Sequence, residues 1–208
     1  MFNKKSIIIS LLVTGVVGMG IPTAVYAESP SDSGVTYSDY QEAFAAQAEY
    51  DFNRGFGGFD SDDVRMGEVY ITDDDTPTFV EEFPDGSYAF YTYADNQLYN
   101  PLSIDAGAEN GAQYYENKIG YNEYWNNIWV EQEGIDENGP YRLKAAYAFT
   151  EDRKSVELVL SIRSEDDGET WYNDGKLMTE EEVDEATRLT PEDIECYYFY
   201  WDFMTSRL

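Results

Sequence analysis

The stretch Val156-Glu157-Leu158-Val159-Leu160-Ser161-Ile162-Arg163 decides the fold most clearly. Val156, Leu158, Leu160 and Ile162 recur at every second position, which predicts a half-buried antiparallel strand with these four side chains on one face. Residues 141–150 before it and Trp171-Tyr172 after it read as further strands, joined by polar turns. This part of the chain therefore predicts an antiparallel meander.

The rest of the chain also favours strands, with a helix on each side. Pro84-Asp85-Gly86 is a turn signal, because proline presets φ and glycine accepts a positive φ. A helix is expected over 38–53, capped by Ser38 or Asp39, and a short one over 179–188. In the short helix, Thr179 and Glu182 have the spacing of a capping box. The remaining predicted strands are 64–72, 79–83, 87–93 and 194–204.

Two segments in the middle of the chain are less clear. Residues 94–111 contain Asn100-Pro101 and two glycines, and we expect a loop there. Residues 112–131 fit two patterns, because Tyr115, Ile119, Tyr124 and Ile128 follow a helical stripe whereas residues 128–130 suit a strand. We favour a helix or an irregular segment to about residue 124, followed by a strand.

Together these elements predict one globular acidic domain over residues 37–208. Its expected class is α+β and mostly β: an antiparallel sheet or a small β-sandwich with an N-terminal helix and a short C-terminal helix. A jelly-roll-like sandwich is the alternative.

The N-terminus has the features of a secretory signal peptide. Lys4 and Lys5 precede an apolar stretch over 7–17, and small or β-branched residues stand at the cleavage positions of Val25-Tyr26-Ala27. The alternative is a membrane anchor, but glycines and a proline interrupt the segment before it reaches the ~20 apolar residues that span a bilayer. We expect residues 1–27 to be removed, residues 28–36 to be disordered, and the product to be secreted without membrane insertion.

The net charge of the chain restricts the kinds of molecule that it is expected to bind. A formal net charge of −29 repels nucleic acids and anionic membranes, and it favours cationic partners and divalent cations. The alternative, which we favour, is that the charge serves solubility and colloidal stability. Aromatic residues make up 16% of the chain, which indicates a folded protein, because disordered acidic chains are poor in aromatics.

The residue types that are missing exclude several mechanisms. The chain has no histidine, which excludes Ser-His-Asp and Cys-His catalysis and histidine-ligated zinc. Its one cysteine, Cys196, cannot form a disulfide within the chain. Either Cys196 pairs with another molecule, or it is a small buried residue among aromatics; we favour the second.

One specific motif follows the strand at 156–163. Residues 164–171 have the form Ser-x-Asp-x-Gly-x-Thr-Trp, in Ser164, Asp166, Gly168, Thr170 and Trp171. Ser164 and Asp166 have oxygens that accept hydrogen bonds from turn amides, Gly168 accepts a positive φ, and Thr170 and Trp171 tie back the outgoing strand. This pattern resembles the Asp-box of bacterial sialidases and related β-proteins.

The resemblance implies a stable β-hairpin at 164–171, since in sialidases the box is structural and lies away from the catalytic centre. Those enzymes have several boxes on a six-bladed propeller, together with an arginine cluster that holds the substrate carboxylate. At about 40 residues per blade, this chain is too short for such a propeller, and it contains one box. Sialidase activity is therefore not expected.

An aromatic cluster is the first candidate site. Tyr121, Tyr124, Trp125 and Trp129 lie among three asparagines, and glycan sites use such rings to stack on sugars while amides bind hydroxyls. The alternative is that Trp125 and Trp129 are core anchors.

A second candidate site is acidic. Asp60, Asp62 and Asp63 have the oxygen ligands that calcium prefers, although they do not complete an EF-hand. The alternative is a set of solvated loop carboxylates. No other cofactor is predicted.

These observations favour a secreted, acidic, non-enzymatic binding module, with a glycan or a cell-surface protein as its ligand. The alternative is an extracellular glycan-active hydrolase that uses paired carboxylates, for which the sequence singles out no residues. The sequence does not specify an oligomeric state.

Overall fold

The computed structural model describes residues 29–55, 58, 60, 63–71, 75–104, 114–122, 125–136, 138–188 and 192–198. The predicted signal peptide lies outside these residues. Within the described part of the chain, no helix is both long and apolar enough to cross a membrane. The segment predicted to be disordered, 28–36, is described from Ser29 on. The Ser29 hydroxyl donates to Gln47 Oε1 at 3.1 Å, and Thr36 forms an isolated bridge with Gln97.

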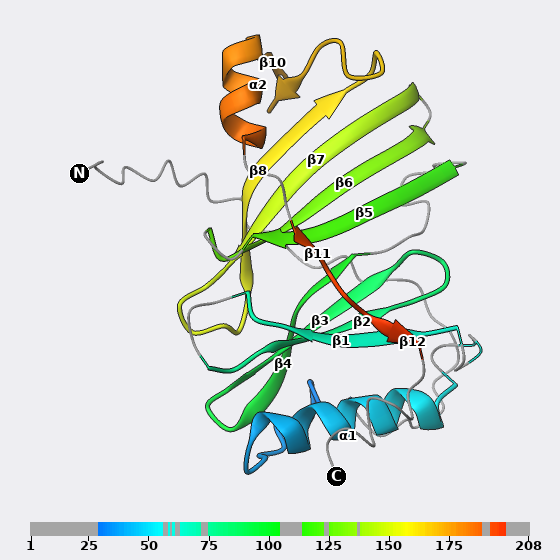
Figure 1. Cartoon of the computed structure of the whole chain (residues 1–208), viewed down its shortest axis with the longest axis vertical. Coiled ribbons are helices and arrows are strands. Elements are labelled where there is room, and N and C mark those ends of the chain that lie inside the picture. Colours follow the sequence, from blue (N-terminus) through cyan, green and yellow to red (C-terminus); the bar gives the residue numbers. More distant parts are fainter. Residues whose placement is uncertain are drawn as a thin grey trace.

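The strands form two antiparallel sheets. Sheet A has the order β12-β1-β2-β3-β4, and sheet B has the order β10-β9-β8-β7-β6-β5-β11 (Figure 1). The expected fold, mostly β with an N-terminal helix and a short C-terminal helix, is confirmed. The bounds are α1 Tyr40–Asn53, β1 Arg65–Val69, β2 Thr78–Glu82, β3 Tyr88–Ala94, β4 Gln97–Ile104, β5 Tyr114–Asn122, β6 Asn127–Asp136, β7 Gly139–Phe149, β8 Val156–Ser164, β9 Tyr172–Asn173, β10 Lys176–Leu177, α2 Glu180–Thr187, β11 Glu192–Asp193 and β12 Tyr197–Tyr198.

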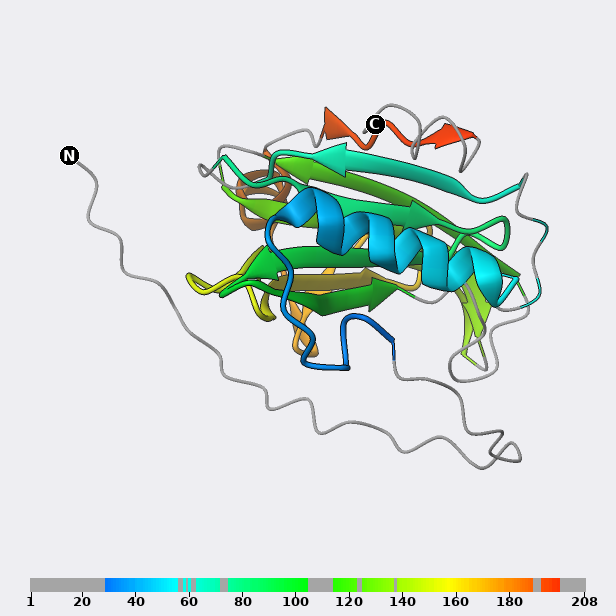
Figure 2. The ribbon, with the colours of Figure 1, turned by 90° about the horizontal axis from the view of Figure 1, so that it is seen from below.

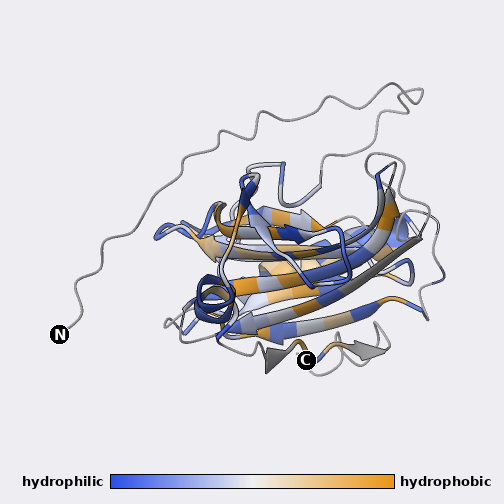
Figure 3. Ribbon diagram, turned by 90° about the horizontal axis from the view of Figure 1, so that it is seen from above, coloured by the Kyte–Doolittle hydropathy of each residue, from blue (hydrophilic) through white to orange (hydrophobic). Residues whose placement is uncertain are grey.

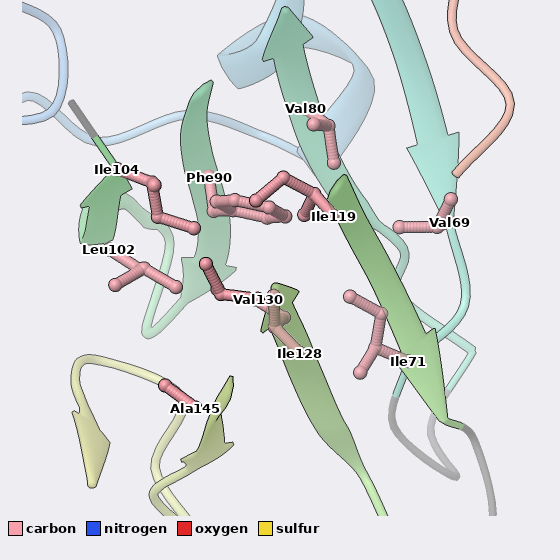
Figure 4. Close-up of a cluster of buried hydrophobic side chains, with 10 residues drawn as sticks. All are labelled: Val69, Ile71, Val80, Phe90, Leu102, Ile104, Ile119, Ile128, Val130 and Ala145. Atoms are coloured by element: carbon pink, nitrogen blue, oxygen red, sulfur yellow. The ribbon is translucent and has the colours of Figure 1, made fainter. Parts of the chain in front are cut away.

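Helix α1, sheet A and sheet B form three successive layers (Figures 1 and 2). Two apolar cores separate them. The first lies between α1 and sheet A and contains Phe44 and Phe79, whose rings stack with centroids 5.3 Å apart. The second lies between the two sheets, where Phe90 of sheet A meets Ile128 and Val130 of sheet B (Figure 4). Sheet A is therefore covered on both faces.

Helix α1 begins where the sequence predicts. Asp39 is the N-cap, and its Oδ1 accepts a hydrogen bond from the Glu42 backbone N–H at 2.9 Å. Glu42 Oε2 accepts in return from the Ser38 backbone N–H at 2.8 Å. These bonds pair amide groups that the first turn of a helix otherwise leaves free. The inner face of α1 is made of Ala43, Phe44, Gln47 and Ala48, all buried.

The prediction of a loop over 94–111 is wrong for residues 97–104, which form strand β4. The Asn100-Pro101 pair is tolerated because β4 is the edge strand of sheet A, where a missing proline N–H costs little. The pairing with β3 also shifts register there, between Phe90 and Thr92. Because of this irregularity, Leu98 packs towards α1 while Leu102 packs towards sheet B.

The preference for a helix up to about residue 124 is also wrong. Residues 114–122 form β5, and β6 begins at Asn127 after a turn. The aromatic and aliphatic residues that suggested a helix recur mostly at intervals of four. A spacing of four places side chains on one face of a strand as well as of a helix, so it did not discriminate between them.

Strand β8 matches its prediction in position but not in the direction of its side chains. Its pairing with β7 shifts register between Ala146 and Tyr147, and this irregularity divides β8 in two. Val156 packs against the core between the sheets, whereas Ile162 pairs with Lys144 on the opposite face. Leu158 and Val159 are exposed. The four alternating residues therefore do not share one face.

The C-terminal part of the chain connects the two sheets. The α2 cap has the predicted box, since Thr179 and Glu182 each accept from the other's backbone N–H, and Figure 3 shows this helix as largely hydrophilic. Beyond it, β11 pairs with β5 of sheet B and β12 pairs with β1 of sheet A. We call residues 192–198 the C-terminal strap. The strap contains Cys196, which packs against the core between the sheets, and burial raises the pKa of its thiol to about 12.

Candidate functional site

The turn between β5 and β6 carries the most exposed tryptophan of the described chain. Trp125 keeps 46% of its surface exposed. Its backbone N–H donates to the carbonyl oxygen of Asn122 at 3.3 Å and to the side-chain Oδ1 of the same residue at 3.2 Å. Asn126 completes the turn with a φ of 52°. The exposed indole thus belongs to a hydrogen-bonded turn at the end of a two-stranded hairpin.

Trp129 lies on the outer face of sheet B. Its neighbours Ile128 and Val130 point into the core between the sheets, so the alternation of a strand directs Trp129 and Asn127 to the other side. Both residues are 6% exposed. Among the described residues, neither the indole Nε1 of Trp129 nor the Oδ1 of Asn127 has a hydrogen-bond partner. A donor and an acceptor are thus buried and unpaired two residues apart on one strand.

The remaining members of the aromatic cluster differ in position. Tyr121 is half-buried and packs against the core between the sheets, on the face opposite to Trp129. Tyr124 lies outside the described residues. Asn122 is buried and pairs directly with Asn127 across the hairpin. The predicted cluster thus divides, and the structure groups Trp125 and Trp129 with the two asparagines. We call Asn122, Trp125, Asn127 and Trp129 the β5–β6 site.

The acidic candidate site is described only in part. Asp60 and Asp63 are exposed, and the Asp63 backbone N–H donates to the Asp60 carbonyl oxygen at 3.0 Å. Asp62 lies outside the described residues. The described residues hold no group of three or more histidine, cysteine, aspartate or glutamate side chains suited to a metal ion. We therefore build no proposal on these aspartates.

The hairpin between β8 and β9 is organised by two side chains. The Ser164 hydroxyl is fully buried; it donates to Asp166 Oδ1 at 2.8 Å and accepts from the Gly168 N–H at 2.9 Å. Asp166 Oδ1 also accepts from the Thr170 N–H at 2.8 Å. The Trp171 indole donates to the Gly168 carbonyl oxygen at 3.1 Å. Hydrogen bonds from Thr170 and then Ser164 lower the pKa of Asp166.

Basic side chains of β7 border this hairpin. Arg142 forms an ion pair with Asp167 at 2.9 Å, and Lys144 lies 5.7 Å from the centre of the Trp171 ring. Glu131 and Glu133 of β6 neutralise these two bases from the other side. Arg142 and Lys144 are thus engaged in structural contacts around the turn. The resemblance to the Asp-box likewise implies a structural role for residues 164–171.

Sequence reasoning missed a carboxyl pair beneath α1. Glu81 of β2 is fully buried, and Tyr91 of β3 donates its hydroxyl to Glu81 Oε2 at 3.3 Å. Asp51 of α1 lies close to Glu81 and accepts a hydrogen bond from Gln47. Burial, followed by the nearby charge of Asp51, raises the pKa of Glu81 well above its usual range. One signal was present: Glu81 lies on the same face of its strand as Phe79, directly after the apolar pair Phe79-Val80.

Comparisons with protein-family models, with curated proteins and with solved structures find no match to this chain.

Proposed function

We propose that this protein is an exported, acidic, non-enzymatic binding module whose ligand is a glycan, contacted at the β5–β6 site. The unpaired Trp129 Nε1 and Asn127 Oδ1 carry the proposal. A buried polar atom without a partner costs about 1–3 kcal/mol, so a group that pairs with it on binding recovers part of that cost. Such atoms in a native structure call for a functional or structural explanation.

A glycan fits the chemistry of this site. A sugar hydroxyl both donates and accepts, so one hydroxyl pair satisfies an indole N–H and an amide oxygen together. The exposed ring of Trp125 offers an apolar surface of the kind on which the C–H face of a sugar stacks. The high negative charge of the chain favours neutral or cationic glycans over sulfated or sialylated ones.

The site is closed in the free protein, because neither unpaired atom is reached by solvent. A ligand must therefore displace the groups that cover them. Association that requires such a change is slower than the usual docking of preformed surfaces. We expect slow binding whose rate is limited by opening.

The alternative, hydrolysis by paired carboxylates, has less support. Glycosidases hold their two carboxyls about 5–9.5 Å apart, with room between them for the scissile bond or a water. Glu81 and Asp51 instead lie close together, and Glu81 is fully buried beneath α1. This pair thus lacks the separation and the access that the reaction requires.

The test uses chain 28–208 on a glycan array, followed by calorimetric titration with any glycan that binds. Trp129→Phe keeps a large ring but removes the N–H, which has no partner in the free protein. We expect its free energy of unfolding to change by less than about 1 kcal/mol while glycan affinity falls about tenfold. Trp125→Ala is expected to weaken binding without unfolding the protein, because its ring is half exposed.

Tyr70→Ala is the matched control, since Tyr70 is another exposed aromatic residue, distant in sequence from the site. It should leave glycan binding unchanged. Retention of full affinity by both Trp125→Ala and Trp129→Phe would remove the β5–β6 site, and the absence of any glycan that binds would remove the ligand class.

Export is tested separately, by mass spectrometry of the protein in the culture medium. We expect a mature N-terminus at Glu28, after cleavage behind Ala27. An intact Met1 or retention with the cells would contradict this part of the proposal.

A further inference from the structure

A second feature, independent of the β5–β6 site, lies in the layer between α1 and sheet A. Two carboxyl groups from different elements, Asp51 and Glu81, lie close together there, and the Tyr91 hydroxyl donates to Glu81. Gln47, one turn before Asp51, donates to the Asp51 carboxylate and also lies 3.3 Å from the Tyr91 hydroxyl. Helix and sheet are thus joined by a small polar network inside an otherwise apolar interface.

The donors around Glu81 are too few for an ionised carboxylate. Oε2 accepts from Tyr91, but Oε1 has no donor among the described residues. Two ionised carboxylates cannot donate a hydrogen bond to each other. Two neighbouring negative charges also repel strongly when water is excluded. A single proton on the pair supplies the missing donor and removes the repulsion, because a neutral Glu81 donates a hydrogen bond and Asp51 accepts it.

Charged or titratable groups face the pair from several elements. From β1, which pairs with β2, Glu68 lies on the same face of sheet A as Glu81. From α1, Arg54 attracts Asp51, but more weakly than burial opposes its ionisation. From β3, Tyr91 is a neutral donor whose own pKa is raised by burial and then by Glu81. From the C-terminal strap, the protonated thiol of Cys196 contributes no charge. No ion pair to Glu81 or Asp51 occurs within the described chain, so nothing there replaces the proton.

We propose that Glu81 and Asp51 share one proton in the folded protein. This proton makes the packing of α1 on sheet A pH-sensitive: the packing is most stable at low pH and becomes less stable as the pH rises. The direction follows from the two states. The unfolded chain releases this proton near the ordinary pKa of a glutamate, about 4.3, whereas the folded pKa of Glu81 is well above its usual value. The stabilisation is therefore complete below that ordinary pKa and is lost as the pH rises through the folded pKa.

The magnitude follows from linkage. Between the unfolded and the folded pKa, folding takes up one proton, so the folding equilibrium constant falls tenfold for each unit of pH. An exported protein meets the pH of its surroundings directly. The pair thus gives the molecule a built-in response to acidification that does not depend on histidine, which the chain lacks.

The test is urea unfolding of chain 28–208 between pH 4.5 and 8.5, for the wild type and Glu81→Gln. The amide of the variant is a permanent donor to Asp51 and does not titrate. From pH 5 to pH 7, we expect the wild type to lose at least tenfold more in its folding equilibrium constant than Glu81→Gln. Hydrogen exchange of the α1 amides, corrected for intrinsic rates, should show the same divergence.

Glu49→Gln is the matched control. Glu49 is exposed on α1, so this change removes the same formal charge without touching the pair. It should keep the pH dependence of the wild type, and any effect of overall charge repulsion appears in it equally. Parallel curves for wild type and Glu81→Gln would overturn the proposal.

A direct measurement covers the case in which Glu81→Gln does not fold. Carbon-13 spectra of wild-type protein labelled in its glutamate carboxyls should show one group that titrates well above the ordinary pKa of a glutamate. If every glutamate carboxyl titrates near its ordinary pKa of about 4.3, the shared proton does not exist.

Discussion

Arg153 donates a hydrogen bond from Nη1 to the carbonyl oxygen of Thr76, at 2.7 Å. Its Nη2 donates to the Pro77 carbonyl oxygen at 3.1 Å, and its own carbonyl oxygen accepts from the Thr92 hydroxyl. Arg153 lies in the turn between β7 and β8 of sheet B, whereas Thr76 and Pro77 precede β2 of sheet A. A buried arginine in an acidic protein thus binds backbone carbonyls and joins the two sheets at one end.

Arg153→Ala is expected to lower the free energy of unfolding by about 2–4 kcal/mol, because buried carbonyl oxygens lose charged donors. The measurement is urea unfolding at neutral pH. Lys154→Ala is the control, since it removes the same charge from the neighbouring residue, whose partner Asp95 is at the surface. Equal losses in the two variants would indicate a general charge effect instead of the link between the sheets.

Gly168→Ala tests the backbone of the β8–β9 turn. Gly168 has a φ of 88°, and an added Cβ would meet its nearest neighbour, Arg142 Nη1, at an ordinary 3.6 Å. The cost is therefore one of conformation and not of space, about 1–2 kcal/mol. Thermal unfolding measures it. An unchanged melting temperature would mean that the turn relaxes without cost.

Asp166 gives the hairpin a pH dependence opposite to that of the Glu81–Asp51 pair. Its folded pKa is lowered by Thr170 and Ser164, so its stabilisation is present above the ordinary pKa of an aspartate, about 3.9, and is lost as the pH falls through the lowered value. Asp166→Asn should therefore destabilise the protein at pH 6 and make little difference below pH 2. A loss that is independent of pH would indicate a steric cause.

Gly67→Ala tests the C-terminal strap. A Cβ on Gly67 would lie 2.5 Å from the Glu195 carbonyl oxygen, and this backbone atom cannot move without displacing the strap. We expect a loss of about 1–3 kcal/mol from overpacking, together with faster proteolysis within residues 192–198. Unchanged protease resistance would show that the strap adapts locally.

Local chemistry predicted several elements of this fold correctly. The cap at Asp39 and the box at Thr179 depend on residues three positions apart, and Pro84-Asp85-Gly86 acts within one turn. Such signals need no knowledge of distant contacts. They therefore predict where elements begin and end.

The errors arose where distant contacts decide the outcome. Asn100-Pro101 is compatible with a strand only because β4 lies at the edge of its sheet. The irregularity that splits β8 is set by its pairing with β7. The Glu81–Asp51 pair joins residues thirty positions apart, and the unpaired atoms of Asn127 and Trp129 become visible only once burial is known. In each case the missing information was the identity of the neighbour.

The C-terminal strap has a consequence for the order of events during synthesis. It supplies the strands that pair with β1 and β5, and it does so from residues 192–198, which emerge from the ribosome after every other described helix and strand. Until the strap is synthesised, β1 and β5 are edge strands of their sheets within the described chain. Pairing at these two edges is therefore a late step of folding, because it follows the synthesis of all the other described elements.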